Sequence, residues 1–361
     1  MGAAAAGCAL PGVSCAQAAG PEAAPVEARF YERLEDKLVR CDLCPRHCVV
    51  PPGGRGECGV RENRDGRYVS LVYGRPCALN LDPIEKKPLF HVLPGTAAFS
   101  IATVGCNIEC KFCQNWDISQ ARPEDVRARY RSPGDIAALA AARGAPTIAY
   151  TYSEPTVFSE YMIDCARAAR ERGLHNVMIS NGYISERPLQ ELCSLMTAVK
   201  IDLKAFTDRF YRETCGGELE PVLETLKRLA DSGIWYEIVV LIVPTLNDGE
   251  DEIRRMADWI VRELGPDVPV HFSRFRPAYK LRNLPPTPPA TLQRARRVAG
   301  EQGCRYVYLG NLPGTDAENT HCPACGATVV ERYGYFVRAV RLNAGNCARC
   351  GHPIPGVWGP A

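Results

Sequence analysis

The segment Val104-Gly105-Cys106-Asn107-Ile108-Glu109-Cys110-Lys111-Phe112-Cys113-Gln114-Asn115-Trp116 places three cysteines in a C-x3-C-x2-C spacing. It directly follows the apolar run 99–104, which predicts a strand. Closed iron–sulfur sites use four cysteines, and closed structural zinc sites use four ligands in total. Three local thiolates therefore predict a 4Fe–4S cluster with one iron left open. The alternative is a set of three buried or zinc-binding cysteines.

An open iron has a specific chemical use. It can chelate the amino and carboxylate groups of a methionine-like ligand and so place a sulfonium beside the cluster. Adding one electron to that sulfonium breaks a carbon–sulfur bond and yields a carbon radical, which is chemistry that the cofactor supplies. The triad Cys106, Cys110 and Cys113 therefore predicts an enzyme of this kind.

The composition excludes several other classes of protein. The 361 residues contain 43 Lys and Arg against 41 Asp and Glu, which gives a net charge of +2 and argues against a charge-driven nucleic-acid binder. Hydrophobic residues make up 46% and charged residues 23%, so wholesale disorder is excluded. No apolar run reaches the ~18–20 residues of a membrane-spanning helix. We expect neither nucleic acid nor a membrane as a partner.

Around the triad, short β-branched runs alternate with helix-length amphipathic segments. Strands are predicted at 99–104, 147–151, 176–180, 198–203, 235–243, 269–273 and 305–309. Helices are predicted at 133–143, 155–172, 187–196, 219–231, 250–264 and 289–302. This alternation predicts an α/β fold with a parallel sheet, as an open or complete α/β barrel.

Two further cysteine sets flank this core. Cys41, Cys44, Cys48 and Cys58 are enough for a closed site of zinc or a second iron–sulfur cluster, with His47 as a substitute ligand and unligated thiols as the alternative. Cys322, Cys325, Cys347 and Cys350 have zinc-ribbon spacing and predict structural zinc. Thiols grouped this closely suit metals better than disulfides, so we expect a reducing, cytoplasmic compartment.

Polar side chains follow several predicted strands, at the end where barrels place ligand residues. Ser153 and Glu154 follow the second strand, where helix capping, with Ser153 as the N-cap, is an alternative role. Asn181 and Gly182 follow the third, where Asn-Gly is commonly only a turn. Asp202 and Lys204 share one strand face and predict an ion pair that can contact a zwitterionic ligand or be purely structural. His271 is a weaker candidate, because a histidine there is more often a hydrogen-bonded core residue.

The triad and its position resemble the radical S-adenosylmethionine (SAM) superfamily, including the aromatic Phe112 before the last cysteine. The resemblance implies a partial (β/α)6 barrel of the TIM type. Residues 152–155 are similar to the superfamily's GGEP-type segment, which holds the methionine amino group, but have Tyr152 and Ser153 in place of two glycines. Residues 180–183 resemble a ribose-contacting segment, and Asp202-x-Lys204 matches the pyruvate formate-lyase activating enzyme type.

A closer resemblance covers about Tyr31 to Trp358. It rests on the segments 41–48, 82–88, 105–116, 149–155, 202–204 and 350–358. Together they look like the radical SAM enzyme of the AmmeMemoRadiSam system, often labelled a pyruvate formate-lyase activating enzyme homologue. The block Asp82-Pro83-Ile84-Glu85-Lys86-Lys87-Pro88 is distinctive, but its residues do not reveal a role. The family implies AMMECR-like and Memo-like proteins as candidate partners.

The resemblance implies reductive cleavage of SAM to a 5′-deoxyadenosyl radical that removes hydrogen from a substrate the residues do not identify. It also implies flavodoxin or ferredoxin as the electron donor. The alternatives are a glycyl-radical-enzyme activase acting on a protein, and a zinc-stabilised binding module without catalysis.

We expect four parts along the chain: a flexible leader at 1–28, a Cys-rich module at 29–95, the barrel at 96–310 and a zinc-ribbon-like module at 311–361. The leader is rich in Ala, Gly and Pro and resembles the end of an export signal, but lacks its charged n-region.

Overall fold

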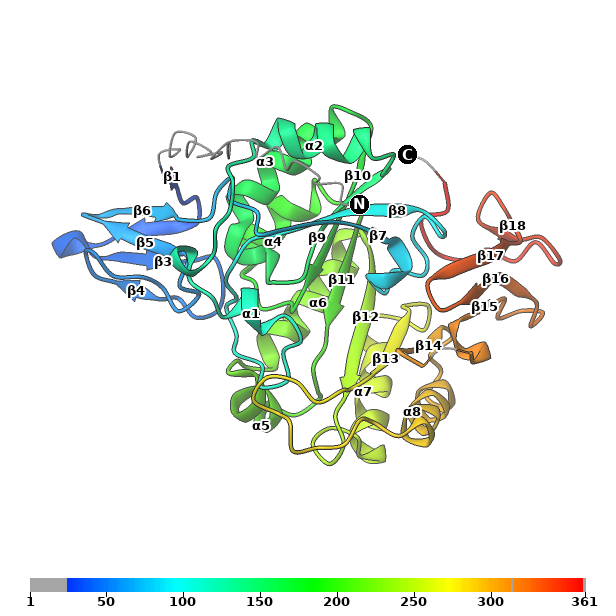
Figure 1. Ribbon diagram of the computed structural model, residues 1–361. Helices are drawn as coiled ribbons and strands as arrows, with labels where there is room; N and C mark the ends of the chain where they lie inside the picture. The colour runs from blue at the N-terminus through cyan, green and yellow to red at the C-terminus, as the bar shows by residue number, and fades with distance from the viewer. Residues whose placement is uncertain (1–24, 313, 360–361) are drawn as a thin grey trace, which may run out of the picture.

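An eight-stranded sheet forms the centre of the computed structural model, which describes residues 25–312 and 314–359 (Figure 1). Seven strands run parallel and lie in the order of the sequence, and β7 pairs antiparallel with β8 at one edge. The strands are β7 (Ala78–Pro83), β8 (Ala97–Ala102), β9 (Thr147–Tyr150), β10 (His175–Ser180), β11 (Ala198–Asp202), β12 (Trp235–Ile242), β13 (Val270–Arg274) and β14 (Val307–Gly310). The predicted mixed α/β fold is confirmed.

Helices fill the connections between the parallel strands. They are α1 (Trp116–Ser119), α2 (Pro133–Ala142), α3 (Ser159–Arg170), α4 (Glu186–Cys193), α5 (Asp208–Phe210), α6 (Glu220–Ser232), α7 (Glu250–Glu263) and α8 (Pro289–Glu301). The six longer ones agree with the predicted helices because each carries a buried face at helical spacing. Within the described residues, no helix combines the length and the apolar character needed to cross a membrane.

The helix predicted at 155–172 is divided in two. Pro155–Phe158 forms a 3-10 turn, and α3 begins at Ser159. Proline has no N–H and suits the first position of a helical turn, where no hydrogen bond from it is needed. The turn brings Glu154 back over its own backbone and fixes that carboxylate at the end of β9.

The parallel arrangement decides where functional residues gather. The inner strands are buried on both faces, as in β9, where all four residues are buried. Their carboxyl ends all lie on the same edge of the sheet, so the segments after β8, β9, β10 and β11 come together there. These are the segments that carry most of the predicted site residues.

The N-terminal strands form two small sheets on one side of the central sheet (Figure 1). The strands are β1 (Val26–Glu27), β2 (Tyr31–Arg33), β3 (Val39–Cys41), β4 (Val49–Val50), β5 (Arg61–Arg64) and β6 (Arg67–Ser70). The predicted leader ends too late, because Val26 and Glu27 pair with β6 and the Ala28 N–H donates to Tyr68 O over 2.8 Å. A two-residue strand has no periodicity that the sequence could reveal. Residues 1–24 of the predicted leader lie outside the described residues.

The C-terminal strands lie on the opposite side of the central sheet (Figure 1). They are β15 (Thr320–His321), β16 (Thr328–Tyr333), β17 (Phe336–Val340), β18 (Leu342–Asn343) and β19 (Asn346–Cys347). The buried Arg332 ties them to the core, since its guanidinium donates to Phe90 O over 2.5 Å and lies 4.3 Å from the Phe90 ring centroid. Val92 and Val357 form a further bridge between the two regions.

His91 lies at the centre of this junction. Its Nδ1 bonds to Pro355 O over 2.7 Å and its Nε2 to the Tyr308 hydroxyl over 2.6 Å. Burial lowers the pKa of His91 to about 4. The ring therefore stays neutral in the folded protein at pH values where an unfolded chain protonates it.

We expect this neutral ring to make the protein acid-sensitive. Between pH 6.5 and about 4, the unfolded state binds a proton that the folded state does not, so stability falls as the pH falls. At about 1.4 kcal/mol per pH unit, His91 removes roughly 3 kcal/mol across this range. Denaturant unfolding of wild type and His91→Gln at several pH values measures the difference in slope. Equal slopes would contradict the assignment.

Candidate functional site

A cavity of about 470 Å³ lies at the carboxyl edge of the central sheet. It brings together residues as far apart in the sequence as Glu85 and Tyr335. Among the residues singled out from the sequence, those that line it are Cys106, Cys110, Cys113, Ser153, Glu154, Asn181, Asp202, Lys204 and His271. Gly182 does not line it. Its φ is +73°, and a Cβ there would lie 3.0 Å from Ile201, so this turn requires a glycine.

Each thiol of the triad has a hydrogen-bond partner. The Asn181 amide donates to Cys106 Sγ over 3.7 Å, and Cys113 Sγ lies 3.2 Å from the Ser119 hydroxyl. Cys110 interacts with Cys215, and this contact, followed by burial, raises the pKa of Cys110. Burial likewise raises the pKa of Cys106 and Cys113. Groups that hydrogen-bond to ligating sulfurs tune an iron–sulfur site.

Cys215 is a neighbour that the sequence did not reveal. It ends a short π-helical turn, Tyr211–Cys215, whose backbone carbonyls accept hydrogen bonds from the triad loop. Cys215 is fully buried and does not line the cavity, whereas the three triad cysteines do. Only the triad therefore presents sulfur to the cavity in the described residues.

Glu154 is buried and held by four hydrogen bonds. Its Oε1 accepts from the Thr156 N–H, the Thr156 hydroxyl and the Ser180 hydroxyl, over 2.7–3.0 Å, and its Oε2 accepts from the Asn181 N–H over 2.8 Å. The capping residue is therefore Glu154, not Ser153 as the alternative role had it, because the Ser153 hydroxyl donates to Thr103 O instead. Burial raises the pKa of Glu154, although the hydrogen bonds from these donors act to lower it.

Tyr152 adopts a backbone conformation that suits glycine. Its φ is +69°, in the left-handed region that costs a non-glycine residue of order 1 kcal/mol or more. Tyr152 thus adopts a conformation that glycine takes without strain, whereas Ser153 has no positive φ. The Tyr152 hydroxyl donates a hydrogen bond to Asp82, which favours this strained conformation.

Asp202 lies between two lysines on β11 and just after it. Lys204 Nζ contacts Asp202 Oδ2 over 2.7 Å, and Lys200 Nζ contacts Oδ1. Burial alone would raise the pKa of Asp202, but the two ammonium groups lower it to about 2. The predicted pair is thus a triad, and sequence reasoning missed Lys200. Strand alternation could have revealed it, because positions 200, 202 and 204 share one face.

The block at residues 82–88 contributes a second carboxylate with two lysines. Asp82 contacts Lys86 Nζ over 2.7 Å and Lys87 Nζ over 2.6 Å. Lys86 and Lys87 both line the cavity. The sequence marked the block as distinctive, but no local pattern shows that it follows the edge strand β7 and lines the same cavity as β11.

His271 is a hydrogen-bonded core residue that also reaches the cavity wall. It lines the cavity, yet its Nε2 lies 2.6 Å from Glu237 Oε2 and burial lowers its pKa. Glu237 also accepts the backbone N–H groups of Phe90 and His91, so the carboxylate is part of the core.

The N-terminal cysteines lie beside the triad loop. A Cβ at Gly105 would lie 3.1 Å from Cys58 O, and Arg46 Nε donates to Asn107 O over 2.5 Å. The thiols interact electrostatically, and burial raises the pKa of Cys44 to about 12 and of Cys58 to about 11. His47, the suggested substitute ligand, bonds to Asp42 over 3.2 Å.

The C-terminal cysteines converge tightly. The Sγ atoms of Cys322, Cys325, Cys347 and Cys350 all lie within 4.8 Å of one another, and among the described residues no other group of three or more Cys, His, Asp and Glu does so. Burial alone would raise the pKa of Cys347. Hydrogen bonds from the backbone N–H groups of Cys350 and Arg349 outweigh this effect and lower the pKa to about 7. This group has the arrangement of a metal site.

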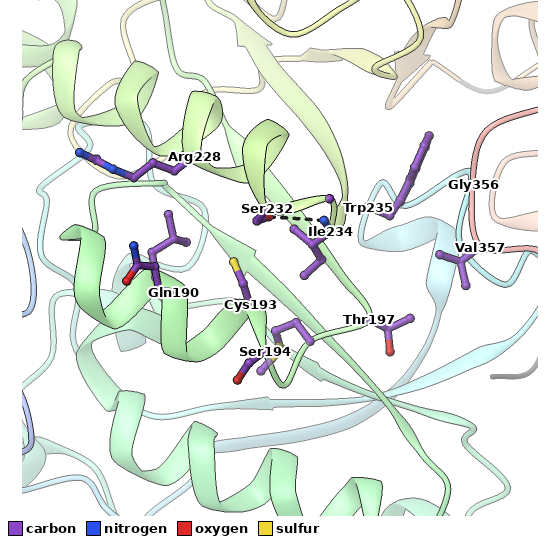
Figure 2. A pocket seen from close by; sticks show the side chains of 13 residues that line it. Gln190, Cys193, Ser194, Thr197, Arg228, Ser232, Ile234, Trp235, Gly356 and Val357 are labelled. Carbon is purple, nitrogen blue, oxygen red and sulfur yellow. Dashed lines mark hydrogen bonds between the residues drawn. The ribbon is translucent and has the colours of Figure 1, made fainter.

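A second hollow, of about 670 Å³, lies at the opposite end of the strands (Figure 2). Figure 2 shows Gln190, Cys193 and Arg228 on its wall, with Thr197 and Trp235 just before β11 and at the start of β12. It contains one thiol and no group of converging acids, bases or thiols. Despite its size, its chemistry does not suit an active site.

Comparison with known proteins agrees with this geometry. The sequence model of the Radical SAM superfamily matches residues 100–260. An uncharacterized protein of Methanocaldococcus jannaschii is 48% identical over 330 residues, which cover 91% of this chain and 98% of that protein. The pyruvate formate-lyase 1-activating enzyme of Escherichia coli K12 is 23% identical over 220 residues, 56% of this chain and 89% of that enzyme. Streptococcus suis SuiB bound to S-adenosylmethionine has a TM-score of 0.47, with 12% identity over 63% of this chain and 53% of that one.

The matched region holds the cysteine triad and four of the strands whose carboxyl ends frame the cavity. The strong similarity to the Methanocaldococcus protein extends over nearly the whole chain, beyond the superfamily region. The chain therefore belongs to the radical SAM superfamily and is a radical SAM enzyme.

Proposed function

We propose that this enzyme binds SAM in the cavity and cleaves it reductively, and that the 5′-deoxyadenosyl radical removes a hydrogen atom from a substrate in the same cavity. The observation that carries the proposal is the inward position of three thiols, Cys106, Cys110 and Cys113, while their buried neighbour Cys215 does not line the cavity. These residues fit a 4Fe–4S cluster with one open iron, since three thiolates leave one iron without a protein ligand. Such a cluster, when bound, supplies the electron that breaks the carbon–sulfur bond.

The surrounding residues have separate tasks. Asn181 and Ser119 hydrogen-bond to sulfurs of the triad, which stabilises added negative charge on them. Glu154 holds a carboxylate at the cavity wall for the ammonium of SAM. Asp202 and Lys204 offer opposite charges to a zwitterion. Ser153 and His271 also line the cavity and are further candidate contacts, whereas Gly182 does not line it.

The cavity also protects a reactive intermediate. Ile108, Val239, Leu241 and Leu309 line it, so part of the wall offers no O–H or N–H group to a radical. Exclusion of water limits side reactions. This apolar wall supports hydrogen abstraction from a bound substrate over quenching by solvent.

We propose zinc for the C-terminal group. A tetrahedral site with Zn–S bonds of about 2.3 Å has sulfur–sulfur edges of roughly 3.8 Å. The Cys322–Cys350 and Cys325–Cys347 sulfurs lie 3.6 and 3.8 Å apart. The group therefore fits a single tetrahedral ion, and we propose a zinc-ribbon-like module around it at 311–361.

We propose a second iron–sulfur cluster for Cys41, Cys44, Cys48 and Cys58. Their sulfurs are less tightly gathered than the C-terminal group, as a polynuclear site requires. Arg61 forms a buried ion pair with Glu160 over 2.5 Å, and it also interacts with the charges of Cys41 and Cys58. Its Nη1 has no hydrogen-bond partner. An anionic cluster would be a partner for this cation.

The remaining assignments follow from the closer resemblance. We propose membership of the AmmeMemoRadiSam system, AMMECR-like and Memo-like partners, flavodoxin or ferredoxin as electron donor, and a cytoplasmic location. We also propose that residues 96–310 form a partial (β/α)6 barrel, with the Cys-rich module before it.

A glycyl-radical-enzyme activase remains a second candidate, because one relative is a pyruvate formate-lyase 1-activating enzyme. Appearance of a glycyl-radical electron paramagnetic resonance (EPR) signal on an added protein would favour it. A zinc-stabilised binding module without catalysis is wrong for the chain as a whole, because the chain is a radical SAM enzyme.

Anaerobic reconstitution with iron and sulfide tests the proposed function. The brown protein, supplied with dithionite and SAM, should release 5′-deoxyadenosine and methionine. Quantification of iron, sulfide and zinc should give enough iron for two clusters and about one zinc per chain. Iron-free protein, or a loaded cluster that leaves SAM intact, would refute the proposal.

A further inference from the structure

We propose that the wall formed by Lys87 and Lys200 binds an anionic group, a carboxylate or a phosphate, on the substrate. This rests on the proposed function of the cavity. It assigns a substrate class to that cavity and a role to the block at residues 82–88. Lys87 and Lys200 both line the cavity, although Lys87 lies in the segment between β7 and β8 and Lys200 lies on β11.

Asp82 is set back from the cavity, because Lys86 and Lys87 line it and Asp82 does not. Its Oδ1 accepts from Lys86, and its Oδ2 accepts from Lys87, from the Ser100 hydroxyl over 2.8 Å and from the Tyr152 hydroxyl. Asp82 is therefore an anchor for Lys87 and not itself a ligand for substrate.

Lys87 is held in place but incompletely satisfied. Its side chain is 2% exposed, and its ammonium lies 4.5 Å from the centroid of the Tyr152 ring. An ammonium has three N–H donors, and one of them contacts Asp82. The other donors have no protein acceptor among the described hydrogen bonds, although the side chain lines the cavity.

Lys200 has the same character on the other side. Its side chain is 6% exposed, and its hydrogen bond to a protein group is the one to Asp202, which Lys204 shares. Each aspartate therefore serves two lysines, and each group of one aspartate and two lysines carries one net positive charge. The Glu154 carboxylate also acts on Lys200, but the proposed function assigns Glu154 to the ammonium of SAM. A buried cation without full compensation is costly, so an anion between the triads is stabilising.

The charged groups that act most strongly on Lys87 support this placement. Asp82 stabilises its ammonium, whereas Lys86 and Lys200 repel it. Burial, the largest influence, and this repulsion lower the pKa of Lys87 to about 8. An anion bound between Lys87 and Lys200 removes the repulsion between them.

The strain at Tyr152 gives an independent reason to regard this wall as functional. A tyrosine at φ +69° is unfavourable, and such conformations persist where the surrounding structure uses them. Here the ring lies beside the Lys87 ammonium and the hydroxyl bonds to Asp82. Tyr152 thus connects the segment that carries Glu154 with Asp82 and Lys87.

Bromide is a suitable probe, because its anomalous scattering locates a small anion directly. Crystals of the reconstituted full chain, soaked in bromide without SAM, should show an anomalous peak between Lys87 Nζ and Lys200 Nζ. Acetate or phosphate added to the bromide soak should weaken the peak by competition. The stronger competitor identifies the preferred anionic group. The peak should disappear in Lys87→Met.

Lys227→Met is the matched control, because Lys227 is a half-exposed lysine on α6 paired with Glu224. It should keep the peak. If Lys87→Met does not fold, Lys200→Met replaces it with the same expectation. Bromide at surface lysines with none at this wall, or a peak that survives both substitutions, would overturn the proposal. Release of 5′-deoxyadenosine by wild type, measured in parallel, separates this failure from failure of the radical chemistry.

Discussion

Cys110→Ala is expected to lower dithionite-driven release of 5′-deoxyadenosine by more than roughly a hundredfold, beyond the 10–100-fold typical of losing a group that only hydrogen-bonds to a metal ligand. Cys110 lines the cavity, as Cys106 and Cys113 do, and is the middle cysteine of the C-x3-C-x2-C spacing. Two thiolates do not hold a 4Fe–4S cluster in the geometry that leaves one iron open. The variant should also lose the charge-transfer absorption of the cluster, which ultraviolet–visible spectroscopy measures alongside product release.

Cys215→Ala is the informative companion to Cys110→Ala. Cys215 contacts Cys110 but does not line the cavity. The variant should keep the iron and the reaction, with a change in midpoint potential, because one neighbour of a ligating sulfur is lost. If Cys215→Ala lost the cluster as completely as Cys110→Ala, Cys215 would be a fourth ligand and the iron would have no open position. That result would remove the basis of the proposed chemistry.

Cys322→Ser is expected to have the largest effect on stability. Structural zinc contributes about 10–16 kcal/mol of apparent binding energy in small zinc domains. Cys322 is buried with Val329, Val330 and Cys347 in an apolar cluster that is separate from the main core. We expect loss of about one zinc per chain and rapid proteolysis within 311–359, measured by metal analysis and mass spectrometry.

The effect should reach the cavity, because Glu318, Gly334 and Tyr335 of the C-terminal region line it. Cys193→Ser is the control, since Cys193 lies on α4 at the other hollow, remote from the metal-binding groups. It should keep its zinc and resist proteolysis. Retention of zinc and of protease resistance in Cys322→Ser would show that the C-terminal cysteines do not hold a structural ion.

Much of the fold follows from local sequence. The parallel strands and the longer helices lie within a few residues of their predicted bounds, because hydrophobic periodicity and capping are properties of neighbouring residues. The strand β7 and the pairing of Val26 and Glu27 with β6 were not predicted. Both depend on a partner strand distant in sequence, and an edge strand carries a weak periodic signal.

The candidate site divides in the same way. Local spacing alone identified the three inward thiols and the convergent C-terminal cysteines, since ligands two or three residues apart can reach one centre. The strand position of Glu154, Asn181 and Asp202 followed from counting residues after β-runs. The roles of Lys87, Lys200 and Cys215 could be inferred only from the tertiary structure. Each of them interacts with a residue that is distant in the sequence: Lys87 with Lys200, and Cys215 with Cys110.

The sequence by itself determined the chemistry that this protein can support, because a metal-binding motif is read within ten residues of chain. Only the tertiary structure decided which thiols face the cavity, that Tyr152 takes a glycine-like conformation, and that two aspartate–lysine triads meet across one space. The physical reason is that charge and coordination act through space over a few ångströms. The order of residues along the chain fixes those distances only after the strands have paired.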